Sequence, residues 1–268
     1  MKKYNNFKPK DLTFVVCAYG ECQYLDTAIN SLLNQTRKAN IIISTSTNNK
    51  HINKVANKYK IDIHINPRPG QIEDYNFALK QANTKLVMLM HQDEILLETF
   101  VEDVIEKLNY SKEPIMSFTN YIEIHNNIVD KKPSTMVKIK RALLIPAKWN
   151  YLMRCRFGKR LIMRIGNPIT HPTVVHVSAK LPDQPFRKKY KSSMDWDLWE
   201  RLSTKKGSFT YIDKVLLYHR MDENNQTVKL LKTTNARYED ELEILKRFWP
   251  APIAKLLMKA YSRSNKYY

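Results

Sequence analysis

Two acidic groups in the sequence are candidates for catalysis, and the first is the pair Asp93 and Glu94. The pair directly follows the apolar run 85–90, which is typical of a buried strand. Adjacent carboxylates at the end of such a strand supply hard oxygen ligands, which suit Mg²⁺ or Mn²⁺ bridging a diphosphate. The same pair would also suit the start of a solvated loop, and spacing alone leaves both interpretations open.

The second acidic candidate is Asp195, which falls at the predicted start of a helix. A carboxylate held there could face a cleft as a general base. Ser192 and Asp195 also have the spacing of a capping box, so a purely structural role is the alternative. Trp196 could line a sugar-binding wall, whereas Trp199 is predicted to lie in the core.

A third polar group, at 218–225, follows a predicted strand. Arg220 could pair with a phosphate, and Asp222 could add a carboxylate to a metal. A solvent-exposed loop would contain the same residue types. His171, which precedes Pro172, is predicted to be either structural or in contact with an acceptor.

A glycine-rich phosphate loop is missing from the sequence, because neither GxGxxG nor GxxxxGK[ST] occurs. A bound nucleotide would therefore need a metal and basic side chains to neutralise its phosphates. Further polar clusters follow the first two predicted strands, at 19–21 and 45–49. Ligands of open α/β sheets bind beyond the carboxyl ends of the strands, where these clusters fall.

The elements that must position these residues alternate between strand and helix in the first half of the chain. Apolar spacing predicts strands at 12–18, 41–44, 61–65, 85–90 and 115–124, with helices at 23–34, 51–59, 72–82 and 97–108. This order predicts an α/β fold with a parallel sheet. The second half is mixed, with strands at 173–177, 209–212 and 215–219 and helices at 192–202 and 228–248, the last broken at 249–252.

The charge of the chain is unevenly distributed. The 268 residues carry a formal charge of +19, of which 131–164 and 246–268 supply 11 and 6 basic residues and no acid. This pattern predicts a globular body with two basic attachments and an anionic partner. Apolar residues alternate with the cations, which suits helices on an anionic membrane surface or ordinary packed helices. No nucleic-acid motif accompanies the charge, so no nucleic-acid partner is expected.

The three cysteines and the hydropathy indicate a compartment. Cys17, Cys22 and Cys155 have no metal-ligand spacing, which favours a reduced, cytoplasmic protein. We expect no signal peptide and no membrane span, because no apolar run approaches about 20 residues. Any membrane contact is expected to be peripheral, at the inner face.

Taken in order, these clusters resemble the inverting family 2 glycosyltransferases of the GT-A fold, over roughly 12–227. The segment 14–36 (FVVCAYGECQYLDTAINSLLNQT) resembles the family's first strand, nucleotide-contacting turn and first helix. HQDE at 91–94 stands at the Asp-x-Asp-Asp metal motif, and Asp195 in MDWDLW at the second position of the Glu-Asp motif. RMDENNQT at 220–227 resembles the late Arg-x-His motif.

Four positions depart from the family pattern. Thr45 lies where the base-reading Asp is usual, His91 replaces the first Asp of the metal motif, Met194 replaces the Glu before the base, and Asp222 replaces the late His. Asp93 and Asp195 are retained. A catalytically degenerate GT-A module that binds membrane or nucleic acid is therefore the alternative function. A nucleotidyltransferase is disfavoured, because AYGECQ is not a glycine-rich, Arg-containing loop.

The resemblance implies a metal-dependent hexosyltransferase that moves a sugar from a nucleotide-diphosphate donor, expected to be a UDP-sugar. The acceptor would be a hydroxyl of a glycan, lipid-linked or protein-linked molecule in surface polysaccharide synthesis. Asp195 would be the catalytic base, and Mn²⁺ or Mg²⁺ would bind Asp93 with support from Glu94 and Asp222. His171 and Trp196 would contact the acceptor. The donor would lie near Ala18, Tyr19, Glu21, Thr45, Asp74, Asn76, His91, Gln92 and Arg220.

The same resemblance predicts the domain organisation. Residues 1–125 would form the nucleotide-sugar-binding, Rossmann-like half of the GT-A fold. Residues 126–227 would bind the acceptor and carry the base, with the basic insertion at 131–164. Residues 228–268 would form basic C-terminal helices.

Overall fold

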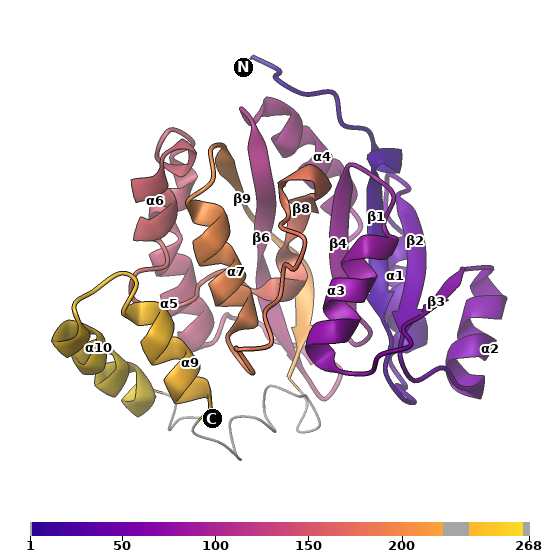
Figure 1. The fold of residues 1–268 in the computed structure, drawn as a ribbon. Helices are drawn as coiled ribbons and strands as arrows, with labels where there is room; N and C mark the ends of the chain where they lie inside the picture. The colour runs from indigo at the N-terminus through magenta and orange to yellow at the C-terminus, as the bar shows by residue number, and fades with distance from the viewer. Residues whose placement is uncertain (1, 222–235, 265–268) are drawn as a thin grey trace.

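The computed structural model describes residues 2–221 and 236–264 of the chain. One mixed sheet forms the centre, and helices cover both of its faces (Figure 1). The strands are β1 (Leu12–Cys17), β2 (Asn40–Thr45), β3 (Ile63–Ile65), β4 (Leu86–His91), β5 (Ile95–Leu96), β6 (Pro114–His125), β7 (Ile128–Val129), β8 (Val175–Val177) and β9 (Ser208–Arg220). The helices are α1 (Leu25–Leu33), α2 (Lys50–Tyr59), α3 (Gln71–Gln81), α4 (Phe100–Tyr110), α5 (Thr135–Leu143), α6 (Arg156–Leu161), α7 (Met194–Ser203), α9 (Ala236–Leu245) and α10 (Ala251–Ser264).

The strand order is β3-β2-β1-β4-β8-β6-β9-β5, with β7 paired to β6. The four strands from β3 to β4 are parallel, as the alternation of strand and helix predicts. β8 is antiparallel to both β4 and β6, and it joins the parallel part to the pair β6 and β9. The second half of the sheet is therefore mixed, as expected.

Alternation along β1 divides the core into two layers. Val15 packs on one face, under α3, α7, α9 and α10, while Phe14 and Val16 pack on the other, under α1, α2 and α4. Successive strand residues point to opposite faces, so a continuous apolar strand serves both layers. This explains why the segment LTFVVC (12–17) is almost entirely apolar and shows no alternation of apolar and polar residues.

Three predicted elements are corrected. The strands expected at 209–212 and 215–219 are one strand, β9. Thr119 of β6 pairs with Ile212 and the next residue, Asn120, pairs with Val215, so 213 and 214 form a bulge inside a continuous strand. The helix expected at 228–248 ends at Leu245 in α9, and its first part lies outside the described residues. The short strand β5 precedes α4, so this helix begins at Phe100 and not at Leu97.

The basic insertion 131–164 was predicted to be attached to the outside of the globular body, but it is part of that body. Its apolar residues enter the core, among them Val137, Leu144, Met153 and Ile162, each at most 3% exposed. Val137 lies on α5, Leu144 and Met153 lie between α5 and α6, and Ile162 directly follows α6. Most of the cations of the insertion reach solvent, whereas Lys159 is buried. α10 is likewise anchored, by Ala254 and Met258. Within the described ranges, no helix is long and apolar enough to cross a bilayer.

Candidate active site

A cavity of about 730 Å³ opens at the carboxyl ends of β1 and β4. This is where parallel α/β sheets bind ligands, because the loops after adjacent strands meet there. The loops after these two strands and the first turn of α3 form one wall. The segments 167–172 and 191–196 form a second wall, together with side chains of α5 and α9. Asp93 and Asp195 both line this cavity, although about 100 residues separate them in the chain.

The end of β4 brings three possible metal ligands together. His91, Asp93 and Glu94 each offer one ligand atom, and these atoms all lie within 4.8 Å of one another. Burial raises the pKa of Asp93, and the neighbouring Glu94 carboxylate raises it further. Glu94 Oε2 is buried without a hydrogen-bond partner in the described part of the chain. Two carboxylates and an imidazole with an unused buried oxygen fit a divalent cation.

His219, near the end of β9, pairs with one of the two carboxylates of this cluster. Its Nδ1 donates to Glu94 Oε1 at 2.6 Å, and Glu94 is fully buried. Burial by itself would lower the pKa of His219, but the Glu94 carboxylate outweighs it and raises the pKa above its usual value. The imidazolium form of His219 is therefore favoured beside the acidic pair.

Asp195 is held at the start of α7 with its carboxylate on the cavity. Its Oδ1 accepts a hydrogen bond from the Trp196 backbone N–H at 2.7 Å, and its Oδ2 accepts one from Asn167 Nδ2 at 2.9 Å. Burial raises the pKa of Asp195, although these two hydrogen bonds and the charge of Lys140 oppose the rise. A raised pKa makes this carboxylate a stronger base than an exposed aspartate.

The backbone amide that a capping box would pair with Asp195, that of Ser192, bonds another residue, although Asp195 itself accepts from the Trp196 amide in the first turn of α7. Asp240 Oδ2, on α9, accepts hydrogen bonds from the backbone N–H groups of Lys191, Ser192 and Ser193. Ser193 is the N-cap residue of α7, and its own side chain makes no capping hydrogen bond. Asp240 thus satisfies the amides before α7 from outside the helix.

On the first wall, the segment after β1 is fixed by the segment after β4. Gln92 Oε1 accepts from the Tyr19 N–H at 2.9 Å, and Gln92 Nε2 donates to the Tyr19 carbonyl at 3.0 Å. Asp74, on α3, accepts from Ser46 Oγ and from Asn66 Nδ2, which ties α3 to the turn after β2. Ala18, Tyr19, Asp74, His91 and Gln92 all line the cavity.

Five of the predicted site residues that the structure describes do not line the cavity, and four of them are buried or directed elsewhere as follows. Glu21 is exposed outside it, and Thr45 is buried beneath it, where Thr45 Oγ1 accepts from the Thr47 N–H. The amide of Asn76 bonds both backbone groups of Phe186 and so joins α3 to the segment before α7. Glu94 lies behind Asp93, fully buried.

Arg220 is the fifth predicted site residue that does not line the cavity, and its neighbour His219 lines the cavity in its place. Adjacent strand residues point to opposite sides, so only one of the two can do so. Arg220 is 2% exposed, donates from Nε to the Asp93 carbonyl at 3.1 Å and stacks on the Tyr24 ring. It therefore supports the segment after β4 from outside the cavity and does not line the cavity itself. Asp222 lies outside the described residues.

An aromatic cluster connects the two walls. The rings of His171 and His91 are 5.3 Å apart, and Tyr75 contacts both. Burial, first of all, holds the pKa of His171 well below its usual value, so this imidazole stays neutral at the cavity. Trp196 lines the cavity, whereas Trp199 is fully buried against His176.

Several cavity residues could not be singled out from the sequence. They are Tyr75, Lys140, Asn167, Thr170, Lys191, His219, Arg237 and Glu241. Lys140 comes from the basic insertion, where it appears as one of 11 similar cations. The Asn-Pro pair at 167–168 was the one local signal that marked a turn there. Apart from His171 and the segment 192–196, the second wall therefore comes from residues outside any motif.

The fold and the site can be compared with known proteins, and the comparison assigns the chain to a family of transferases. Residues 13–171, more than half of the chain, match the family described as glycosyl transferase family 2. The chain belongs to this family of transferases. An uncharacterized glycosyltransferase of Haemophilus influenzae is 24% identical over 257 residues, covering 85% of this chain and 73% of the relative.

Solved structures with the same GT-A fold show low sequence identity. Residues 1–349 of TarS from S. aureus, in complex with UDP-GlcNAc, align with a TM-score of 0.61 at 15% identity, covering 92% of this chain and 70% of that one. Glucosyl-3-phosphoglycerate synthase from Mycobacterium tuberculosis, in complex with Mn²⁺ and UDP-glucose, aligns with a TM-score of 0.52 at 14% identity, covering 79% and 71%. The predicted fold class is confirmed.

Proposed function

We propose that the protein is an inverting glycosyltransferase that moves a hexosyl group from a UDP-sugar to a hydroxyl group of a glycan, lipid-linked or protein-linked acceptor. The observation that carries this proposal is that Asp93 and Asp195, from segments far apart in the chain, line one cavity. TarS and the glucosyl-3-phosphoglycerate synthase have this fold and were each solved with a UDP-sugar. A role in surface-polysaccharide synthesis is part of the same proposal.

The donor wall would hold the UDP-sugar between the segment after β1 and the start of α3. Asp93, with His91 and Glu94, would hold Mn²⁺ or Mg²⁺ there, since their ligand atoms lie within 4.8 Å of one another. A divalent cation in this place neutralises the charge that develops on a departing diphosphate. His219 would add a second positive charge beside the same group, because Glu94 favours its protonated form.

The other wall would hold the acceptor. Asp195 would remove the proton of the acceptor hydroxyl while the oxygen attacks the anomeric carbon from the face opposite the diphosphate. A single displacement inverts that carbon. Asn167 and the Trp196 N–H fix the direction of the carboxylate, so its position does not depend on the ligand. The Trp196 ring would form the apolar side of this acceptor site.

The first prediction concerns the two acids. In Mn²⁺, we expect wild-type protein to release UDP from one member of a panel of UDP-glucose, UDP-galactose and UDP-N-acetylglucosamine. Asp195→Asn should keep donor binding, measured by thermal shift, and lose about 100-fold or more of the turnover. Asp93→Asn should lose the Mn²⁺-dependent part of donor binding.

Asp183→Asn, at an exposed aspartate outside the cavity, is the matched control and should behave like wild type. If wild-type protein binds the donor but turns it over no faster than Asp195→Asn does, the transferase proposal is contradicted and a degenerate binding module is favoured. No donor binding at all would contradict the assignment of the cavity.

We further propose that an anionic membrane surface is a partner of the basic helices. Although the insertion packs into the core, Ile139 and Ile145 stay 45% and 48% exposed among its cations, and Leu256 on α10 is 68% exposed. α5, α6 and α10 lie on one side of the molecule (Figure 1). Exposed apolar side chains between lysines and arginines suit the surface of an anionic bilayer.

A further inference from the structure

A second pocket lies at the opposite end of the sheet from the cavity. It has a volume of about 320 Å³, close to the lower limit of small-molecule sites. Ser208, at the start of β9, lines it, whereas His219, near the end of the same strand, lines the cavity. Eleven residues of extended strand separate the two sites by about 35 Å. A ligand in this pocket would therefore not touch the donor or the base.

The charge of this pocket has one sign. Lys2, Lys112 and Arg154 line it, and none of the described lining residues is acidic. Each of the three cations lacks an ion pair within the described ranges, unlike most arginines around α7. Behind the pocket, the buried ammonium of Lys159 lies 5.6 Å from the centre of the Phe209 ring, and Phe209 is itself a lining residue. Cations gathered without a counter-charge favour an anion.

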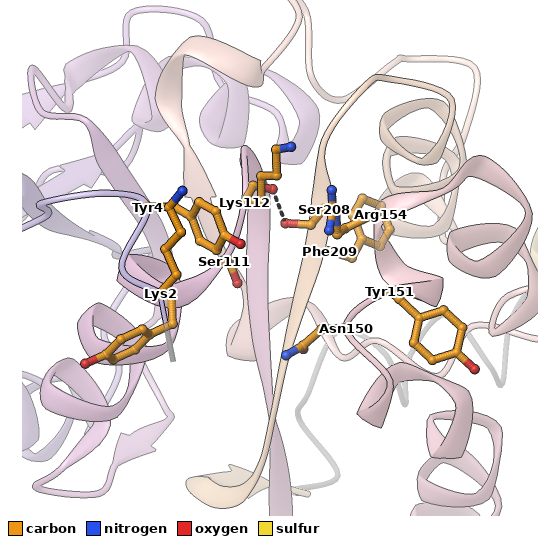
Figure 2. Close-up of a pocket in the computed structure, with 10 residues that line it drawn as sticks. Lys2, Tyr4, Ser111, Lys112, Asn150, Tyr151, Arg154, Ser208 and Phe209 are labelled. Carbon is orange, nitrogen blue, oxygen red and sulfur yellow. Dashed lines mark hydrogen bonds between the residues drawn. The ribbon is translucent and has the colours of Figure 1, made fainter.

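The walls of the pocket are also suited to a sugar. Tyr4, Tyr110 and Tyr151 present rings, and Ser111 and Asn150 present hydrogen-bonding groups. Figure 2 shows Tyr4 and Asn150 on different sides of the pocket with their polar ends turned toward the space between them. Tyrosine combines a rigid apolar face with a hydroxyl group. A saccharide also has apolar faces and hydroxyl groups, so the two surfaces are complementary.

The N-terminal wall is held in place by several hydrogen bonds. The Tyr4 N–H donates to the Asn109 carbonyl at 2.8 Å, and Asn5 Nδ2 donates to the carbonyls of Leu108 and Ser111. Phe7 N–H donates to Asn109 Oδ1. These hydrogen bonds anchor the segment to the end of α4, with Tyr4 at the pocket. The opposite wall, 150–154, is part of the basic insertion.

We propose that this pocket is a second binding site, for an anionic saccharide: a sugar that carries a phosphate or a carboxylate. Such a ligand is either a free sugar phosphate or a charged unit of a longer glycan, and both share the same chemistry. The proposal does not depend on the transfer reaction, because the site contains none of the cavity residues. A longer glycan bound here would also keep an acceptor chain on the enzyme between transfers.

Isothermal calorimetry with the full chain tests the proposal, with UDP and Mn²⁺ at saturating concentration to occupy the cavity. The ligands are glucose 6-phosphate, polygalacturonate, glucose and inorganic phosphate. We expect saturable binding of glucose 6-phosphate, of polygalacturonate or of both, and at least about tenfold weaker binding of glucose and of phosphate. Which of the first two binds more tightly distinguishes a free sugar phosphate from a glycan chain.

Matched variants assign the binding to the pocket. Arg154→Ala and Lys112→Ala should each weaken it by about tenfold, whereas Arg156→Ala and Lys54→Ala should not. These control residues are exposed and do not line the pocket. UDP binding should be the same in all four variants, so a failure of the donor site would be seen separately.

Four results would overturn the proposal. They are no saturable binding of either anionic ligand, equal binding of inorganic phosphate and glucose 6-phosphate, binding unchanged in Arg154→Ala and Lys112→Ala, and equal binding of uncharged glucose. Loss of anionic-vesicle binding in Arg154→Ala without any saccharide binding would assign this surface to a membrane and also overturn it.

Discussion

At the scale of single residues, Asn167 determines how Asp195 is presented to the cavity. Its Oδ1 accepts from the Ile169 N–H at 3.2 Å, which turns the amide nitrogen toward Asp195 Oδ2. A hydrogen bond to the charged form of a carboxylate lowers its pKa. Asn167 therefore partly offsets the rise that burial imposes on Asp195, together with the charges of Lys140 and Arg237.

The residue-scale prediction follows from that hydrogen bond. Asn167→Ala should raise the pKa of Asp195 further, because the charged form loses a partner while burial persists. The acidic limb of the kcat/KM profile should then move to higher pH by about one unit, since a hydrogen bond to a charged group contributes on the order of 1.5 kcal/mol. The measurement is donor turnover between pH 4 and pH 9.

Asn53→Ala, on α2, serves as its control. Asn53 Nδ2 bonds the Asn49 carbonyl within its own helix region and lies outside the cavity. An acidic limb that stays in place in Asn167→Ala, at reduced or unchanged rate, would show that Asn167 does not act through Asp195.

At the scale of elements, α7, the helix that carries Asp195, is held in place by the buried Asp197. Asp197, on α7, is fully buried and pairs with Arg187, Arg201 and Arg247. These arginines come from the segment before α7, from α7 itself and from the segment after α9. Burial by itself would raise the pKa of Asp197, but the three guanidinium groups hold it below its usual value.

The element-scale prediction is that Asp197→Asn lowers the free energy of unfolding by about 3 kcal/mol at pH 7, because it leaves buried charge unpaired. The pKa is lower in the folded chain, so this contribution is complete above the unfolded pKa near 4 and disappears as pH falls through the folded value. Urea unfolding at pH 7 and in more acidic buffer measures both effects.

The comparison variant is Asp26→Asn, which removes an exposed pair with Lys58. Exposed ion pairs contribute little, so its effect should be much smaller at every pH. Equal destabilisation by the two substitutions would mean that the arginine cluster does not hold α7.

At the scale of the whole molecule, the charge of +19 is combined with exposed apolar side chains on the basic helices. We predict that the protein sediments with liposomes that contain anionic lipid at 50 mM salt and much less at 300 mM, because salt screens the attraction. Leu256→Glu should weaken this binding. Ile128→Glu, at a position that is 72% exposed on β7, should leave it unchanged.

Equal sedimentation with neutral vesicles would remove the electrostatic part of the membrane proposal. Equal weakening by Leu256→Glu and Ile128→Glu would show that α10 is not the contacting element. The donor-binding assay supplies the control that both variants are folded.

The local elements of the first half and two acidic positions could be predicted from the sequence. The period of apolar residues and the ends of strands depend on neighbours in the chain, so β1 to β4 and their helices could be predicted. Asp93 could be predicted as a site residue because it comes just after the end of β4. The resemblance to the family rested on two of these segments and on two motifs of the second half, and it is confirmed. The direction of Arg220 could not be predicted, since a change of one residue in β9 register exchanges it with His219.

Only the tertiary structure decided which side chains meet across the cavity. Asn167 and Lys140 reach Asp195 from segments without a motif, and Asp240 caps α7 from about 45 residues further along the chain. The sequence could not show whether the basic insertion lies inside or outside the core, because burial depends on what packs against it. Contacts between distant segments follow from packing of the whole chain, while propensity and period act over a few residues.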